Sequence, residues 1–128
     1  MQSGVGQGSG KIILLGEHSV VYGRPAIAAG LPQGCSARAE LASENSLLVE
    51  PWGVRVTHAR EESDPDRELL RRAFIALCER LGPEPRPIAV HASMQIPGGA
   101  GLGGSAALSV AVLRAASETR ARMNCCSL

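Results

Sequence analysis

Aromatic side chains are almost absent from this sequence of 128 residues, which contains one tryptophan, one tyrosine and one phenylalanine. Because 45% of the residues are nevertheless hydrophobic, any core must be built from alanine, valine, leucine and isoleucine. A chain of this length is one domain's worth of sequence and can bury a core of its own.

The sequence also lacks a block of charge of one sign. Thirteen basic residues stand against twelve acidic ones, for a formal charge of +1, which argues against a nucleic-acid-binding surface. No apolar stretch approaches the roughly 20 residues that span a bilayer, so no membrane partner is expected. The opening MQSGVGQGSGK has neither the charged start nor the apolar middle of a signal peptide, and we expect a cytoplasmic protein.

Cysteine pairs at ligand or disulfide spacing are missing as well. Cys35 and Cys78 stand singly in apolar patterns, while Cys125 and Cys126 are neighbours, and all three histidines lie far from them in sequence. This arrangement argues against a disulfide scaffold and a zinc site, and predicts buried or incidental thiols.

Five segments have the character of β-strands. Residues 35–41 and 88–96 alternate apolar and polar side chains, as half-buried strands do. Pro51 and Gly53 separate two shorter candidates and indicate a hairpin-like turn. The fifth is a short buried strand after a glycine-rich lead-in. The expected strands are residues 11–15, 35–41, 46–50, 54–58 and 88–96.

Two segments have helical character, which makes the expected class α+β. The first is amphipathic, begins at an Asp64 cap followed by Pro65, and ends at Gly82 and Pro83. Its apolar side comprises Leu70, Phe74, Leu77 and Leu81, and its solvated side Arg67, Arg71 and Arg72. The second, SAALSVAVLRAA from Ser105, is apolar nearly all round and should be buried on most sides.

Between the last strand and the second helix the chain reads PGGAGLGGSAAL. The first N–H groups of a helix lack intrahelical partners and bind anions readily, and glycine lets the backbone approach them closely. This loop is therefore a candidate phosphate-binding site. Ser105 could cap the helix or turn its hydroxyl to a metal ion bound to the phosphates.

Two other phosphate loops fit poorly. Gly99, Gly101 and Gly104 satisfy G-x-G-x-x-G, but SETRARMNCCSL after the helix does not predict the second strand of a dinucleotide fold. GQGSGKI resembles a Walker A loop, yet Val5 replaces its first glycine and Ile12 its Mg²⁺-binding hydroxyl.

A second motif lies in KIILLGEHSVVYGRPAIAAGL. Lys11, the only lysine of the chain, opens the predicted strand and Gly16 ends it. Glu17 and His18 follow, and residues 20–22 begin a second extended piece that turns at Gly23. Taken singly, Lys11 reads most simply as surface charge and His18 as an ordinary histidine.

Together the two motifs resemble the GHMP kinases, and most closely the mevalonate kinase branch of that family. The first motif is similar to its Gly-Lys strand, Gly-Glu-His and Val-Val-aromatic-Gly signature, and the second to its ATP phosphate loop, Pro-x-x-x-Gly-Leu-Gly-Ser-Ser-Ala-Ala. Galactokinases have Thr-Asp-Tyr where this chain has Ser19, Val20 and Val21, and phosphomevalonate kinases usually have Glu-Tyr in place of Glu17 and His18.

The resemblance implies a role for each matching residue. Lys11 would be catalytic, stabilising the developing alkoxide, and Glu17 and His18 would bind the acceptor. Ser105 would also ligate Mg²⁺. The implied reaction is transfer of the ATP γ-phosphoryl group to mevalonate in isoprenoid biosynthesis, with ATP and Mg²⁺ as cofactors. The ATP-binding residues would be Pro97, Gly98, Gly99, Ala100, Gly101, Leu102, Gly103, Gly104, Ser105 and Ala106.

The match departs from the family at Ser9, where proline is usual, and at Gly104, where the first serine of the pair stands. The family's catalytic aspartate and metal-binding glutamate lie well beyond the phosphate loop. The only aspartates here are Asp64 and Asp66, at a predicted helix start. We therefore expect weak nucleotide binding and little turnover from this chain alone.

The resemblance also implies a domain organisation. Residues 1–122 would be part of an N-terminal ATP-binding domain related to a ribosomal protein S5 domain, without the ferredoxin-like C-terminal domain. Residues 123–128 would be an atypical, frameshifted tail. The helix after the loop would then expose apolar surface, and a homodimer is compatible with the longer protein. Two alternatives stay open: another GHMP small-molecule kinase, and a non-catalytic module that keeps the fold.

Overall fold

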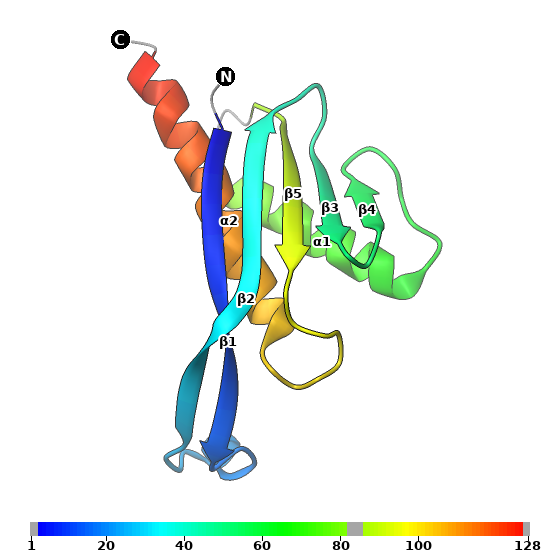
Figure 1. Ribbon diagram of the computed structural model, residues 1–128. Helices are drawn as coiled ribbons and strands as arrows, with labels where there is room; N and C mark the ends of the chain where they lie inside the picture. The colour runs from blue at the N-terminus through cyan, green and yellow to red at the C-terminus, as the bar shows by residue number, and fades with distance from the viewer. Residues whose placement is uncertain (1–2, 82–85, 127–128) are drawn as a thin grey trace.

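The computed structural model describes residues 3–81 and 86–126, which form a five-stranded mixed sheet with two helices on one of its faces (Figure 1). This arrangement confirms the α+β class. In chain order the elements are β1 (Ser3–Leu15), the 3-10 helix η1 (Ser19–Tyr22), β2 (Ile27–Leu41), β3 (Ser46–Glu50), β4 (Val54–Thr57), α1 (Pro65–Arg80), β5 (Ile88–Met94) and α2 (Gly104–Cys126).

The strands lie in the order β1-β2-β5-β3-β4, antiparallel except for the parallel pair β3 and β5. The predicted alternation is confirmed, since Ala37 pairs with Ala92 and Ala39 with Val90, all buried under the helices. Leu41, placed on the same side by the pattern, is exposed. The turn between β3 and β4 contains Gly53 at φ 64°, as Pro51 and Gly53 predicted.

The glycine-rich lead-in to the predicted strand 11–15 is itself the first half of β1, so the strand begins earlier than predicted. Gly4, Gly6 and Gly8 face α2, where an added Cβ would overlap the carbonyl oxygens of Ala115, Ala111 and Ala107 respectively. Only glycine permits this close contact between strand and helix. The pattern therefore serves helix packing.

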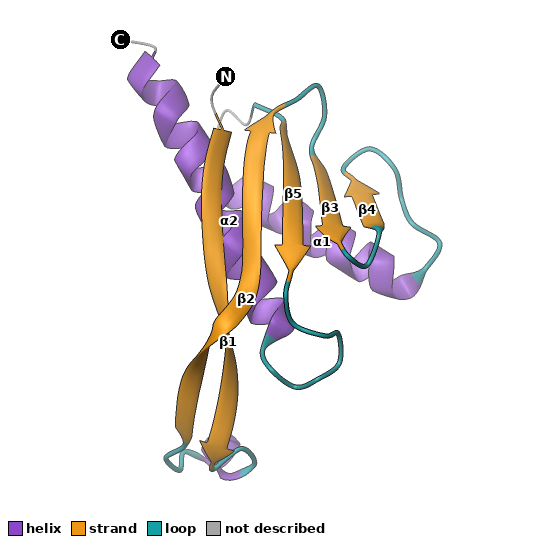
Figure 2. Cartoon of the chain, in the orientation of Figure 1, coloured by secondary structure: helices purple, strands orange, loops and turns teal. Residues whose placement is uncertain are grey.

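Beyond Gly10, β1 and β2 continue as a twisted two-stranded ribbon that projects past the helices (Figure 2). The predicted burial of residues 11–15 is wrong, since Leu15 is 67% exposed. Residues 20–22 were predicted to be extended but belong to η1. Gly16 at φ 86° ends β1 and Gly23 at φ 77° ends η1, as their turn roles predicted.

Helix α1 begins as predicted, with the Asp64 carboxylate accepting from the N–H groups of Asp66 and Arg67, and Pro65 in the first turn. Phe74 and Cys78 are its buried residues, and Leu70, Leu77 and Leu81 pack on the core. Gly82 and Pro83, predicted to end the helix, lie outside the described residues.

Helix α2 is buried on one side only, so the predicted burial on most sides is wrong. Ala107, Ala111 and Ala115 face the sheet, whereas Val110 and Leu113 are exposed. The helix runs on to Cys126, so the change of composition at residue 123 does not interrupt it. Within the described residues no helix is both long and apolar enough to cross a membrane.

Candidate functional site

The loop between β5 and α2 bends at three glycines. Gly99, Gly101 and Gly103 have φ of 73°, 70° and 74°, a region that residues with a Cβ rarely adopt. Nothing lies within 4 Å of a Cβ built on Gly99 or Gly101. The loop backbone is therefore open to a ligand.

Helix α2 begins directly at the end of this loop. The carbonyl of Gly103 accepts from Ala107 N–H at 3.0 Å, so Gly103 precedes the first turn and the N–H groups of the next three residues have no intrahelical acceptor. Ser105 lies inside the first turn, which rules out its reading as a plain N-cap. Its exposed hydroxyl makes no hydrogen bond within residues 3–81 and 86–126. The arrangement suits a bound oxyanion.

Lys11 lies against the same loop. Its N–H donates to the carbonyl of Leu102 at 2.9 Å, and a Cβ on Gly103 would lie 2.9 Å from the Lys11 Cγ. A residue near the start of the chain and a loop near its end are thus brought together by the pairing of β1, β2 and β5. Lys11 is exposed.

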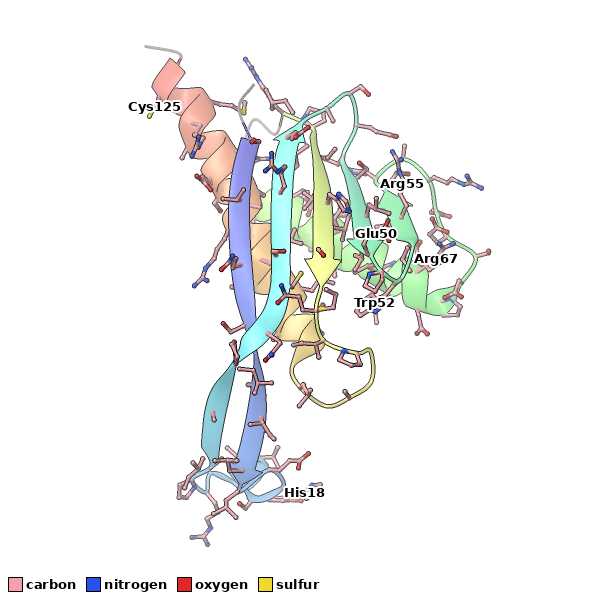
Figure 3. The ribbon with its side chains drawn as sticks, viewed as in Figure 1. His18, Glu50, Trp52, Arg55, Arg67 and Cys125 are labelled. Carbon is pink, nitrogen blue, oxygen red and sulfur yellow. The ribbon has the colours of Figure 1, made fainter. Side chains whose placement is uncertain are left out.

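Glu17 and His18 are not brought to the loop. They lie between β1 and η1 at the tip of the ribbon, both exposed, and Figure 3 shows His18 there, away from the loop. Neither residue lines the cavity beside the glycine loop. The structure therefore divides the predicted site residues into two groups along the ribbon.

A cavity of about 520 Å³ lies between the loop, the β3–β4 turn and the start of α1. Residues 97–105 all line it, and of the predicted loop residues only Ala106 does not. The indole of Trp52 faces Gly98, 3.7 Å from the position of a Cβ there. The other walls are Val54, Asp66, Arg67, Leu70 and Leu108.

Sequence reasoning missed this second wall. Trp52, the only tryptophan of the chain, is 42% exposed in the β3–β4 turn (Figure 3). The available signal in the sequence was a single tryptophan between Pro51 and Gly53, in a segment predicted to be a turn. Arg67 was expected on a solvated face, but it is half-buried and lines the cavity.

A hydrogen-bonded segment fixes the start of α1 beside the cavity. The Glu68 carboxylate accepts from Glu62 N–H at 2.9 Å and pairs with Arg71 and Arg72. Above all the backbone hydrogen bond from Glu62, and then the two arginines, hold the pKa of Glu68 below its usual range. Asp66 and Arg67 are thereby positioned on the cavity wall.

Arg71 was also expected on the solvated side of α1, and this expectation is wrong. Its side chain is 12% exposed, and it donates to the carbonyls of Thr57 at 3.0 Å and His58 at 2.7 Å. It therefore joins α1 to the end of β4 and does not belong to a solvated face.

The donor set fits phosphates better than a protein-bound metal. No group of three or more His, Cys, Asp or Glu that could hold a metal ion occurs in the part of the chain that the structure describes. The free hydroxyl of Ser105 is one oxygen ligand, and Mg²⁺ commonly takes its others from phosphates and water. A cation would thus reach this site with its phosphates.

The open sheet, the glycine loop and the helix start together define an α+β domain whose loop geometry suits a bound phosphate. Residues 68–123 match the model of the family described as the GHMP kinases N terminal domain. A mevalonate kinase of Methanothermobacter thermautotrophicus is 37% identical over 105 residues, which cover 82% of this chain and 33% of that protein. The chain thus spans about a third of the length of this relative.

Two solved structures share the fold at lower identity. The mevalonate kinase of Methanococcus jannaschii superposes with a TM-score of 0.70 at 24% identity, covering 88% of this chain and 39% of that one. A Lactococcus lactis galactokinase complexed with galactose gives 0.64 at 19% identity, covering 84% and 30%. The chain belongs to the GHMP kinase family, and its curated relatives are mevalonate kinases.

Proposed function

We propose that this chain is the nucleotide-binding part of a kinase that transfers the γ-phosphoryl group of ATP to the primary alcohol of mevalonate. The observation that carries the proposal is the contact of Lys11 with the glycine loop, through Leu102 and Gly103. A cation beside a row of free backbone N–H groups is what in-line phosphoryl transfer requires.

The loop and the start of α2 would bind the phosphates of ATP. Three left-handed glycines keep the backbone bare, and the N–H groups of Gly104, Ser105 and Ala106 point out of the helix start. The Ser105 hydroxyl would hold Mg²⁺, which would supply charge neutralisation at the phosphates. The arrangement is carried by the backbone, so it tolerates the replacement of the family's first serine by Gly104.

The cavity next to the loop would take the nucleoside. Its volume of about 520 Å³ lies within the usual range for small-molecule sites. Trp52, Val54 and Leu70 provide apolar walls, and an indole can stack on a base. Asp66 and Arg67 provide a polar edge that can hydrogen-bond to the base or the ribose.

The acceptor would lie along the ribbon, between Lys11 and the tip. Lys11 would stabilise the alkoxide that develops on the acceptor, and Glu17 and His18 would bind the rest of it. Because the chain spans about a third of the length of its mevalonate kinase relative, we propose that residues 1–122 act as the N-terminal domain of a longer enzyme. The chain alone would bind nucleotide without transferring phosphate.

The test is calorimetric titration of Mg-ATP into the chain and two variants. We expect saturable binding that weakens about tenfold in Ser105→Ala, since a ligand of the bound metal is lost. Ser117→Ala, at an exposed position on the same helix, is the matched control and should bind as the wild type does. Absence of saturable heat in the wild type would favour the non-catalytic module.

A second assay tests the acceptor. Release of ADP is followed with mevalonate, phosphomevalonate and galactose, for the chain alone and for a version completed with the second domain of a mevalonate kinase relative. We expect turnover only in the completed protein, only with mevalonate, and lost in Lys11→Met. Preference for another alcohol would reassign the chain to another GHMP kinase, because the L. lactis galactokinase has the same fold.

A further inference from the structure

A second cavity, of about 680 Å³, opens on the face of the sheet that the helices leave bare. It shares no residue with the cavity beside the glycine loop. Side chains from three neighbouring strands line it, together with one arginine from α2. Its polar lining is Gln7, Ser36, Arg38, His91, Ser93 and Arg114.

Strand register places these side chains in rows. Ser36 pairs with Gln7 on one side and Ser93 on the other, while Arg38 pairs directly with His91. These residues alternate with the buried Ala37 and Ala92, and therefore point away from the helices. Across β2 and β5 the two hydroxyls thus lie opposite each other, and the two basic side chains form the next row on the same face.

Arg114 reaches the same hollow from the other side of the sheet. It lies on α2 and donates from Nη1 to the carbonyl of Gln7 at 2.7 Å, across the edge of β1. One nitrogen of the guanidinium is engaged by this bond, which fixes the group at the rim. Its remaining N–H donors are available to a ligand.

The hollow is basic and its charges are not neutralised. No acidic residue lines it, and neither Arg38 nor His91 makes a hydrogen bond or ion pair within the described ranges 3–81 and 86–126. The carboxylates nearest to the hollow are Glu40 and Glu50, by strand register, and Glu118 on α2, which accepts from the N–H of the lining residue Val5 and pairs with Arg122. Within the described residues none of the three forms an ion pair with Arg38 or Arg114.

We propose that this hollow binds the phosphate group of a small metabolite, as a second anion site on the sheet face away from the nucleotide cavity. Arg38 and Arg114 present planar donor forks that match phosphate oxygens. Ser36 and Ser93 add neutral donors, and His91 adds a third positive charge when protonated. A dianion balances the two arginines better than a monoanion does.

The three histidines lie in different parts of the fold, so their NMR signals can show where phosphate binds. The ring-proton shifts of His18, His58 and His91 are followed by NMR while the chain is titrated with inorganic phosphate, with acetate and chloride at matched ionic strength as comparisons. We expect a saturable shift at His91 alone. Acetate and chloride should give small, linear shifts.

Two matched variants test whether Arg38 is responsible for the phosphate binding observed at His91. Arg38→Gln should weaken phosphate binding at His91 by about tenfold, because one charge-assisted contact is lost. Arg55→Gln removes an exposed arginine of β4 on the same face and should leave the affinity for phosphate unchanged. The unfolding midpoints check that both variants fold. Equal shifts with chloride, equal effects of the two variants, or shifts that follow His18 as much as His91 would overturn the proposal.

Discussion

Among single residues, Cys78 shows how strongly this small core affects a side chain. It lies on α1 and is 3% exposed. Burial raises the pKa of its thiol to about 11, against a weaker opposing effect of Arg120 on α2. The thiol is thus protonated at neutral pH and acts as a packing group, as its isolated place in an apolar pattern predicted.

Cys78 should therefore resist alkylation in the folded protein. At a pH of about 8, a thiol with a pKa of about 11 is only about one part in a thousand thiolate, and burial adds a steric barrier. Residue-resolved mass spectrometry with iodoacetamide should show rapid modification of the exposed Cys125 and none at Cys78 until denaturant is added. Modification of both at similar rates would contradict the buried position of Cys78.

Arg71 and Arg72 are adjacent arginines that should behave differently. Arg71→Ala removes donors to two carbonyls at the end of β4 and should lower the free energy of unfolding by about 1–3 kcal/mol. Arg72, 76% exposed and paired only with Glu68, is the matched control, for which about 0–0.5 kcal/mol is expected on replacement by alanine. Urea unfolding measures both, and equal losses would refute the role given to Arg71.

Composition could not separate these two residues. Both stand in the same helical stretch with the same charge, and only the position of the β4 end decides which one is buried. The same limit applies to Trp52 and Arg67, whose place on the cavity wall depends on how the β3–β4 turn meets α1. Residue types indicate candidate chemistry, whereas tertiary contacts select among them.

Between elements, the closest packing joins β1 and α2. Glycines of the strand lie against alanines of the helix, and α2 also covers the open edge of β1. The Glu118 carboxylate accepts from Val5 N–H at 2.8 Å, and Arg114 Nη1 donates to the Gln7 carbonyl at 2.7 Å. The strand edge is thus protected from pairing with another chain.

Gly6→Ala tests this packing. The new Cβ would overlap the carbonyl oxygen of Ala111, which is backbone and cannot rotate away, so we expect a loss of about 3 kcal/mol or failure to fold. Gly30→Ala, in the exposed part of β2 where nothing lies within 4 Å, is the matched control and should be neutral or slightly stabilising. Thermal unfolding compares them, and a tolerated Gly6→Ala would refute the close packing.

The periodicity of the sequence predicted most elements well, but it did not predict the glycine-rich first half of β1. The alternation of residues 35–41 and 88–94 and the cap at Asp64 are local signals, and each predicted its element. A run of glycines separated by polar residues has no β-propensity, and its reason lies in a helix near the other end of the sequence. The exposure of the ribbon was missed for the converse reason, because the four apolar residues 12–15 look the same in the sequence whether or not a helix covers them.

At the scale of the whole molecule, acid should weaken the fold through Glu68. Its native pKa is lowered, so its contribution to stability is present above the unfolded value near 4.5 and is lost as pH falls through the lower native value. The slope of stability against pH between these two values should be smaller in Glu68→Gln. An unchanged acid slope in urea titrations would show that Glu68 contributes nothing there.

The whole chain also leaves much apolar surface uncovered, as expected for one part of a longer kinase. Val110 and Leu113 on α2 and the residues of the ribbon are exposed. The motifs predicted the glycine loop and Lys11, and the fold brings these together. Glu17 and His18 lie apart from them at the ribbon tip, a separation that motif order alone does not reveal.

The most direct test of the central claim observes the amides of the glycine loop. Amide shifts of residues 99–106 and the indole of Trp52 are followed by NMR as Mg-ATP or adenosine is added. Binding of phosphates by the loop backbone predicts saturable shifts at Gly101, Gly103 and Ser105 with Mg-ATP, whereas adenosine should shift the Trp52 indole alone. Loop amides that stay unmoved while Mg-ATP binds elsewhere would contradict the claim.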